Sequence, residues 1–109
     1  MRTVSTETEF KNLMDKKQLL LVYFSTLSCS VGEALEPKVE DLVTRRFPKI
    51  ELIFVDMNAL PTVSADYQVF VEPTLLLFAD GKESMRKSRH LSLVELEENL
   101  NRIYQLLFG

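Results

Sequence analysis

The stretch from Leu19 to Val43, LLLVYFSTLSCSVGEALEPKVEDLV, predicts a buried strand that leads into a helix. Leu19 to Phe24 is an uninterrupted apolar run of strand length, which is the pattern of a strand covered on both faces. Small polar residues follow, and from Val31 onward the apolar side chains recur at helical spacing. The only cysteine of the chain, Cys29, therefore stands at or just before the N-terminus of the predicted helix.

This position gives Cys29 two possible roles. The unpaired N–H groups and the positive end of a helix dipole stabilise a thiolate, which is the form of cysteine that attacks disulfides. A lone cysteine is also commonly a small buried apolar residue. Glu33 and Glu36 bring negative charge to the start of the helix, and this charge opposes ionisation of the thiol. The residues alone leave both roles open.

The length and composition of the chain limit the classes of function. The 109 residues, 46% of them hydrophobic, predict one compact domain spanning residues 1–109. The net charge of −3 provides no general attraction to nucleic acid or to an anionic membrane, so we expect neither as a partner. No apolar run approaches the roughly 20 residues of a membrane span. Residues 1–15 lack the apolar core of a signal peptide, and a cytoplasmic location is the expectation.

The single cysteine also limits covalent and metal chemistry. One cysteine allows no disulfide within the chain, and one cysteine with one histidine is too few for a structural zinc site. We therefore expect no metal and no cofactor.

The remaining segments predict further strands and helices. Two capping boxes, Thr6 with Glu9 and Ser92 with Glu95, mark the starts of helices. The expected elements are a short strand within Met1–Ser5, a helix ending near Lys16, the strand Leu19–Phe24, a helix from about Ser30 to Phe47, the strand Ile50–Asp56, a short helix within Leu60–Val69, the strands Thr74–Ala79 and Lys82–Arg89 joined by a hairpin at Asp80-Gly81, and a final helix after Ser92. This order predicts an α/β fold, with a central mixed sheet and helices on both of its faces.

The last expected strand is rich in basic residues. Its cations are Lys82, Arg86, Lys87 and Arg89. Charged side chains on an edge strand discourage pairing between sheets, and we interpret them in this way rather than as an anion site. His90 follows them and is interpreted as a lone surface imidazole.

Two segments of the chain resemble thioredoxin. LLVYFSTLSCSVGEALEP resembles the active-site segment, in which a buried strand leads to a Cys-x-x-Cys pair and to a helix that contains a proline. DMNALPTVSADYQVFVEPTLLLFADGK is similar to the segment that contains the cis-proline loop, a strand and a hairpin. The positions that match in order and spacing are Cys29, Pro37, the loop Val71-Glu72-Pro73-Thr74 and Asp80-Gly81. The resemblance implies a thioredoxin fold over almost the whole chain, a cis peptide bond before Pro73, and a place beside Cys29 for this loop.

The chain departs from the thioredoxin pattern at the active site. Its motif is Cys29-Ser30-Val31-Gly32, with Gly32 where thioredoxins carry the second, resolving cysteine. Ser28 replaces the usual tryptophan, and Tyr23 occupies the place of the buried acid that assists proton transfer. Because dithiol reduction resolves its mixed disulfide with the second thiol, this chain cannot complete that step alone.

Two types of side chain should shift the pKa of the Cys29 thiol in opposite directions. Glu72 would bring a further carboxylate near the sulfur and raise the pKa of the thiol, whereas the hydroxyls of Ser28 or Ser30 could hydrogen-bond a thiolate.

Two hypotheses about function follow. In the first, the protein is a monothiol redox protein: Cys29 attacks a protein disulfide or accepts a low-molecular-weight thiol, and an external thiol resolves the mixed disulfide. Glu72, Pro73 and Thr74 would then hold the substrate in extended form by strand addition. In the second, the protein is a non-catalytic binding module that uses the cis-proline groove. A monothiol glutaredoxin is a further variant, but the chain resembles thioredoxin around Cys29 and lacks a recognisable glutathione-binding pattern. Iron–sulfur ligation by a Cys29 dimer is therefore a minor alternative. Its length and charge suit a monomer or a weak homodimer.

Overall fold

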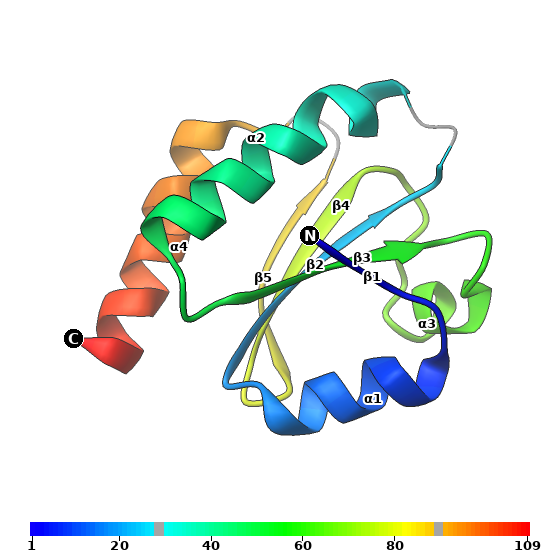
Figure 1. Cartoon of the computed structure of the whole chain (residues 1–109), viewed down its shortest axis with the longest axis horizontal. Helices are drawn as coiled ribbons and strands as arrows, with labels where there is room; N and C mark the ends of the chain where they lie inside the picture. The colour runs from blue at the N-terminus through cyan, green and yellow to red at the C-terminus, as the bar shows by residue number, and fades with distance from the viewer. Residues whose placement is uncertain (28–29, 89–90) are drawn as a thin grey trace.

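The strands form one mixed sheet in the order β1-β3-β2-β4-β5 (Figure 1). A computed structural model describes residues 1–27, 30–88 and 91–109 of the chain, and for residues 30–33 it describes the backbone alone. The strands are β1 (Arg2–Val4), β2 (Leu19–Ser25), β3 (Glu51–Asp56), β4 (Thr74–Ala79) and β5 (Lys82–Ser88). β3 pairs with β1 and β2 in parallel, whereas β4 pairs with β2 and β5 antiparallel. The predicted mixed sheet is therefore confirmed.

Helices cover both faces of this sheet. They are α1 (Glu7–Lys16), α2 (Ser30–Arg46), α3 (Pro61–Asp66) and α4 (Leu93–Phe108). In Figure 1, α2 and α4 lie on one side of the strands, and α1 and α3 lie on the other. The order of strands and helices is the predicted one, and α2 contains Pro37 within its span, also as expected.

β2 lies at the centre of the sheet, and all seven of its residues are buried. Its side chains alternate between two hydrophobic clusters, as the pleat of a strand requires. Leu19, Leu21 and Tyr23 belong to the cluster with α2 and α4, and Leu20, Val22 and Phe24 belong to the cluster with α1 and α3. An uninterrupted apolar run is needed here because both faces of the strand are covered.

The hairpin between β4 and β5 has a regular turn and one irregular pair. Asp80 and Gly81 both adopt positive φ, 50° and 79°, as a two-residue type I′ turn requires. The register then shifts, because Phe78 pairs with Glu83 and Leu77 pairs with Met85. The extra residue between them forms a β-bulge, which changes the face on which the following side chains lie.

The helix starts follow the predicted caps. The Thr6 hydroxyl accepts a hydrogen bond from the Glu9 N–H at 3.1 Å, and the Ser92 hydroxyl accepts one from the Glu95 N–H at 3.3 Å. The Glu9 carboxylate accepts from the Ser5 N–H rather than from the cap residue itself. This bond and the Arg2 guanidinium lower the pKa of Glu9.

α3 is shorter than the predicted helix within Leu60–Val69. Gln68 adopts φ 55°, its N–H donates to the Ala65 carbonyl, and the Val69 N–H donates to the Ser64 carbonyl at 2.8 Å. These bonds are those of a Schellman motif, which ends a helix with a residue in the left-handed conformation. The helix therefore ends at Asp66, because Gln68 takes the place that glycine usually fills.

Candidate functional site

Three loops meet at the end of the sheet where β2 finishes. The carbonyl of Ser25, the last residue of β2, accepts a hydrogen bond from the Met57 N–H just after β3, at 2.8 Å. Phe24 pairs with Thr74, the first residue of β4. The segments after β2, after β3 and before β4 are therefore neighbours. The carboxyl ends of parallel strands, here β2 and β3, are a common position for ligand sites in α/β proteins.

The loop before β4 is fixed by its own backbone and side chains. The peptide bond between Glu72 and Pro73 is cis, as the resemblance implied. Pro73 is buried, and Thr74 is 2% exposed. The Thr74 hydroxyl donates to the Val71 carbonyl at 2.7 Å and so closes the loop from within. The three predicted substrate-binding residues, Glu72, Pro73 and Thr74, thus form one short ordered segment beside the end of β2.

The predicted active-site motif lies only partly within the described structure. Ser28 and Cys29 lie outside the described residues, as do Arg89 and His90 at the end of β5. Ser30, Val31 and Gly32 are the first three residues of α2, and their side chains are not described. The expected proximity of Cys29 to the cis-proline loop stays a prediction.

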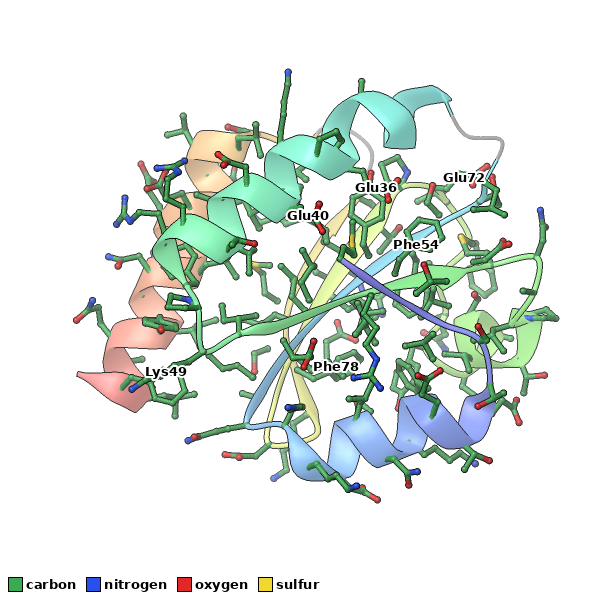
Figure 2. The ribbon with its side chains drawn as sticks, in the orientation of Figure 1. Glu36, Glu40, Lys49, Phe54, Glu72 and Phe78 are labelled. Carbon is green, nitrogen blue, oxygen red and sulfur yellow. The ribbon has the colours of Figure 1, made fainter. Side chains whose placement is uncertain are left out.

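Glu72 has an unusual environment for a carboxylate. Its side chain is half-buried and lines an open cavity of about 370 Å³ next to α3. The Oε2 atom of Glu72 is buried and has no hydrogen-bond partner among the described residues. Figure 2 shows Glu72 and Glu36 at the same end of the molecule, where β2 ends and α2 begins. This end of the sheet therefore carries a carboxylate oxygen that lacks a donor.

Comparison with known proteins identifies the family. Residues 2–102 match the family model described as Thioredoxin. The chain belongs to the thioredoxin family. It is 32% identical to "Thioredoxin-like protein YdfQ" of Bacillus subtilis, over 91% of this chain and 88% of that protein. It is 30% identical to "Thioredoxin-2" of Pyricularia oryzae over 76% of this chain, although the match spans 48% of that longer protein.

The comparison of structures agrees with the sequence match. The crystal structure of Fasciola hepatica thioredoxin superposes with a TM-score of 0.83 and 31% identity, and the match covers 94% of this chain and 98% of that one. The thioredoxin fold predicted from the two quoted segments is therefore confirmed, and the protein belongs to a redox protein family whose members typically act on protein disulfides.

The position of the thioredoxin buried acid is aromatic in this member of the family. Tyr23 is fully buried, and its ring stacks on Phe54 with 6.0 Å between the centroids and 21° between the planes. Both rings belong to the cluster that α2 and α4 cover. A packed aromatic side chain thus fills the core where the resemblance to thioredoxin places a buried acid.

Exposed apolar side chains border the site, and the sequence analysis missed them. Leu27 is 76% exposed, Phe70 77% and Val71 39%. Phe70 and Val71 directly precede the cis-proline loop, and Leu27 follows β2. Exposed large apolar side chains that gather beside a binding loop are typical of surfaces that contact other proteins. The run Val69-Phe70-Val71 before the loop was the available signal in the sequence.

Arg86 is a second residue whose role the sequence analysis missed. Its guanidinium donates to the Tyr67 carbonyl at 2.6 Å and to the Gln68 carbonyl at 3.2 Å, and it pairs with the Glu83 carboxylate at 2.9 Å. The hydrogen bond from Arg86 lowers the pKa of Glu83, and that from Glu83 raises the pKa of Arg86. Arg86 therefore ties β5 to the start of the loop that carries Glu72. The interpretation of the basic strand as a charged edge that discourages pairing between sheets did not include this role of Arg86.

Within residues 1–27, 30–88 and 91–109, no cluster of histidine, cysteine and carboxylate side chains could hold a metal ion. In the same described part of the chain, no helix is long and apolar enough to cross a bilayer.

Proposed function

We propose that the protein is a monothiol redox protein of the thioredoxin family, acting through Cys29 in a single domain of residues 1–109. The observation that carries the proposal is the retention of cysteine directly before α2, in a chain that keeps the cis-proline loop beside the end of β2. Gly32 replaces the resolving cysteine, so the reaction ends at a mixed disulfide unless another thiol enters.

The proposed reaction has three exchange steps. In the first step, the Cys29 thiolate attacks one sulfur of a disulfide, a new S–S bond forms, and the other sulfur leaves as a thiolate that takes a proton from water. In the second step, an external low-molecular-weight thiolate attacks the substrate sulfur of the mixed disulfide. The Cys29 thiolate leaves, and the substrate carries the external thiol as a new disulfide. A second external thiol then releases the substrate thiol and forms the disulfide of the small thiol.

The cis-proline loop would hold the substrate during this exchange. The backbone groups of Glu72 and Thr74 can pair with an extended peptide, while Leu27, Phe70 and Val71 offer it apolar contacts. A reducing cytoplasm would supply the external thiol, and this supports the proposed location.

The test compares the reactivity of Cys29 in the folded protein with that of the same cysteine in a short unfolded peptide. The substrate is a peptide with one cysteine, held as a mixed disulfide with 2-nitro-5-thiobenzoate, whose release is coloured. A synthetic peptide of residues 26–33 gives the intrinsic reactivity of this cysteine. We expect the protein to react at least about tenfold faster at pH 7 than this peptide, because a thiolate is the attacking species. Mass spectrometry should show one peptide added to the protein, and 2-mercaptoethanol should remove it.

The variant Cys29→Ser carries no thiol and should form no adduct. A rate equal to that of the synthetic peptide contradicts the proposal. In that case the alternative, a binding module that uses the cis-proline loop, is favoured if peptides still bind the protein.

A further inference from the structure

The cavity beside the cis-proline loop combines an apolar wall with one charged group. Residues of α3, of the loops after β2 and β3 and of the loop before β4 line it, among them Thr26, Asn58, Pro61 and Glu72. Among the described residues of this lining, Glu72 is the only charged one. The apolar groups of Met57, Val69 and Phe70 can cover the stem of a long side chain, and the carboxylate of Glu72 can pair with a cation at the end of that side chain.

The Glu72 carboxylate is in need of a donor. Its buried Oε2 atom has no hydrogen-bond partner among the described residues. Arg86, which donates to the Tyr67 and Gln68 carbonyls at the start of this loop, is occupied by these bonds and by its pairing with Glu83. A carboxylate with a buried and unpaired oxygen is costly, and a cation that binds the same carboxylate from the cavity lowers that cost.

We propose that this cavity binds a lysine or arginine side chain of the substrate, and that Glu72 thereby selects disulfides in basic peptide segments. A cation on the substrate would pair with the carboxylate of Glu72 while its stem lies against the apolar wall. The cavity of about 370 Å³ is large enough for one such side chain, and it is lined by Glu72, the residue directly before Pro73, along whose loop the substrate backbone would run. This inference rests on the peptide binding in the proposed function, but it does not depend on the chemistry of Cys29.

The experiment therefore uses peptides that cannot undergo thiol exchange. Acetylated and amidated heptapeptides carry serine at the centre and lysine at one of the two positions on either side. In matched peptides, norleucine or glutamate replaces the lysine. Each peptide is titrated into the ¹⁵N-labelled full chain up to about 10 mM, and dissociation constants are taken from the shifts of the backbone amide signals.

We expect one lysine position to bind about tenfold more tightly than its norleucine counterpart, which corresponds to about 1.4 kcal/mol. The largest shifts should fall on amides around the cavity, among them those of Thr26, Asn58 and Phe70. The glutamate peptide should bind most weakly. Higher salt should reduce the preference for lysine, because screening weakens the attraction between the charges.

Two variants separate the cavity from the general acidity of this end of the molecule. In Glu72→Gln, the ratio between the lysine and norleucine peptides should fall to about one. In Glu36→Gln, which removes a carboxylate of α2 that does not line the cavity, the tenfold ratio should remain. An amide spectrum with the dispersion of the parent protein verifies that each variant is folded.

Three results would overturn the proposal. They are equal affinity for lysine and norleucine peptides at every position, a preference that survives in Glu72→Gln, and the absence of any amide shift at 10 mM peptide. A preference for lysine together with an unreactive Cys29 would keep this inference and reject the monothiol reaction, so the two failures are distinguishable.

Discussion

Replacing Arg86 with methionine tests how the candidate site is attached to the sheet. Methionine keeps a long apolar stem and removes the guanidinium, so the carbonyls of Tyr67 and Gln68 lose their donors and Glu83 loses its partner. A hydrogen bond from a charged group in a protected position contributes about 1.5–3 kcal/mol. The Arg86 side chain is 36% exposed, so water and salt reduce that value. We expect Arg86→Met to lower the free energy of unfolding by about 2 kcal/mol in total.

The assay is urea unfolding at pH 7, followed by circular dichroism. With a urea dependence of about 1–3 kcal/mol per molar for small proteins, the midpoint should fall by about 1 M. Lys87→Met is the matched control, because Lys87 lies on the same strand and pairs with the exposed Glu95 on the other side of the sheet. A single ion pair with one exposed partner contributes about 0–1 kcal/mol, so this variant should lose less than half as much.

The consequences of Arg86→Met should also be local. Amide hydrogen exchange should speed up in residues 67–72 of this variant, and it should not change there in Lys87→Met. Equal stability losses in the two variants, or unchanged exchange in residues 67–72, would refute the assignment of Arg86 as the anchor of the loop.

Further predictions concern a titration, a buried hydroxyl and a helix end. Because the hydrogen bond from Arg86 lowers the pKa of Glu83 in the folded state, this pair stabilises the protein above the ordinary carboxyl pKa of about 4.3 and loses its effect as pH falls through the lowered value. Glu83→Gln should therefore cost up to about 1 kcal/mol at pH 7, and in urea unfolding this loss should shrink as pH falls below the ordinary carboxyl value; a loss that does not change with pH would contradict this. Thr74→Val removes a buried hydroxyl bond within the cis-proline loop and should cost about 1–2 kcal/mol; a variant as stable as the parent would show that the bond contributes nothing. Gln68→Gly relieves a left-handed residue at φ 55° and should raise the free energy of unfolding by about 0.5 kcal/mol, so a lower urea midpoint would be the contrary result.

The fold could be predicted because its main signals are local. The apolar run of β2, the capping serine and threonine residues and the Asp80-Gly81 turn each specify a piece of backbone with little help from the rest of the chain. The order of these pieces then leaves few arrangements for the sheet.

The role of Arg86 could not be predicted because it depends on a β-bulge. In a regular strand, residues three apart lie on opposite faces, so Glu83 and Arg86 would be separated. The extra residue in β5 makes Glu83 pair with Phe78 and Arg86 pair with Leu76, and both of these partners face α1 and α3. The two charged side chains therefore meet on the side where the carbonyl groups of Tyr67 and Gln68 lie.

The environment of Glu72 could also not be predicted from the sequence. The sequence analysis expected the Glu72 carboxylate near the thiol of Cys29, because the residue precedes the cis-proline. In the structure the side chain lines the cavity bordered by α3, together with Thr26 from the loop after β2. The spacing along the chain fixed the position of the residue in the loop, but the face toward which its side chain points depends on the packing of α3 against the sheet.

The pH dependence of Cys29 alkylation in the reduced protein tests the monothiol proposal most directly. The reaction is followed by mass spectrometry with iodoacetamide, and the synthetic peptide of residues 26–33 serves as the reference. The proposal predicts a midpoint well below the value of about 8.5 for a free cysteine, because the N-terminus of α2 then outweighs the carboxylates of Glu33, Glu36 and Glu72. A midpoint at or above 8.5, or labelling that requires denaturant, would contradict the proposal and leave a thioredoxin-like protein that binds its partners without exchanging thiols.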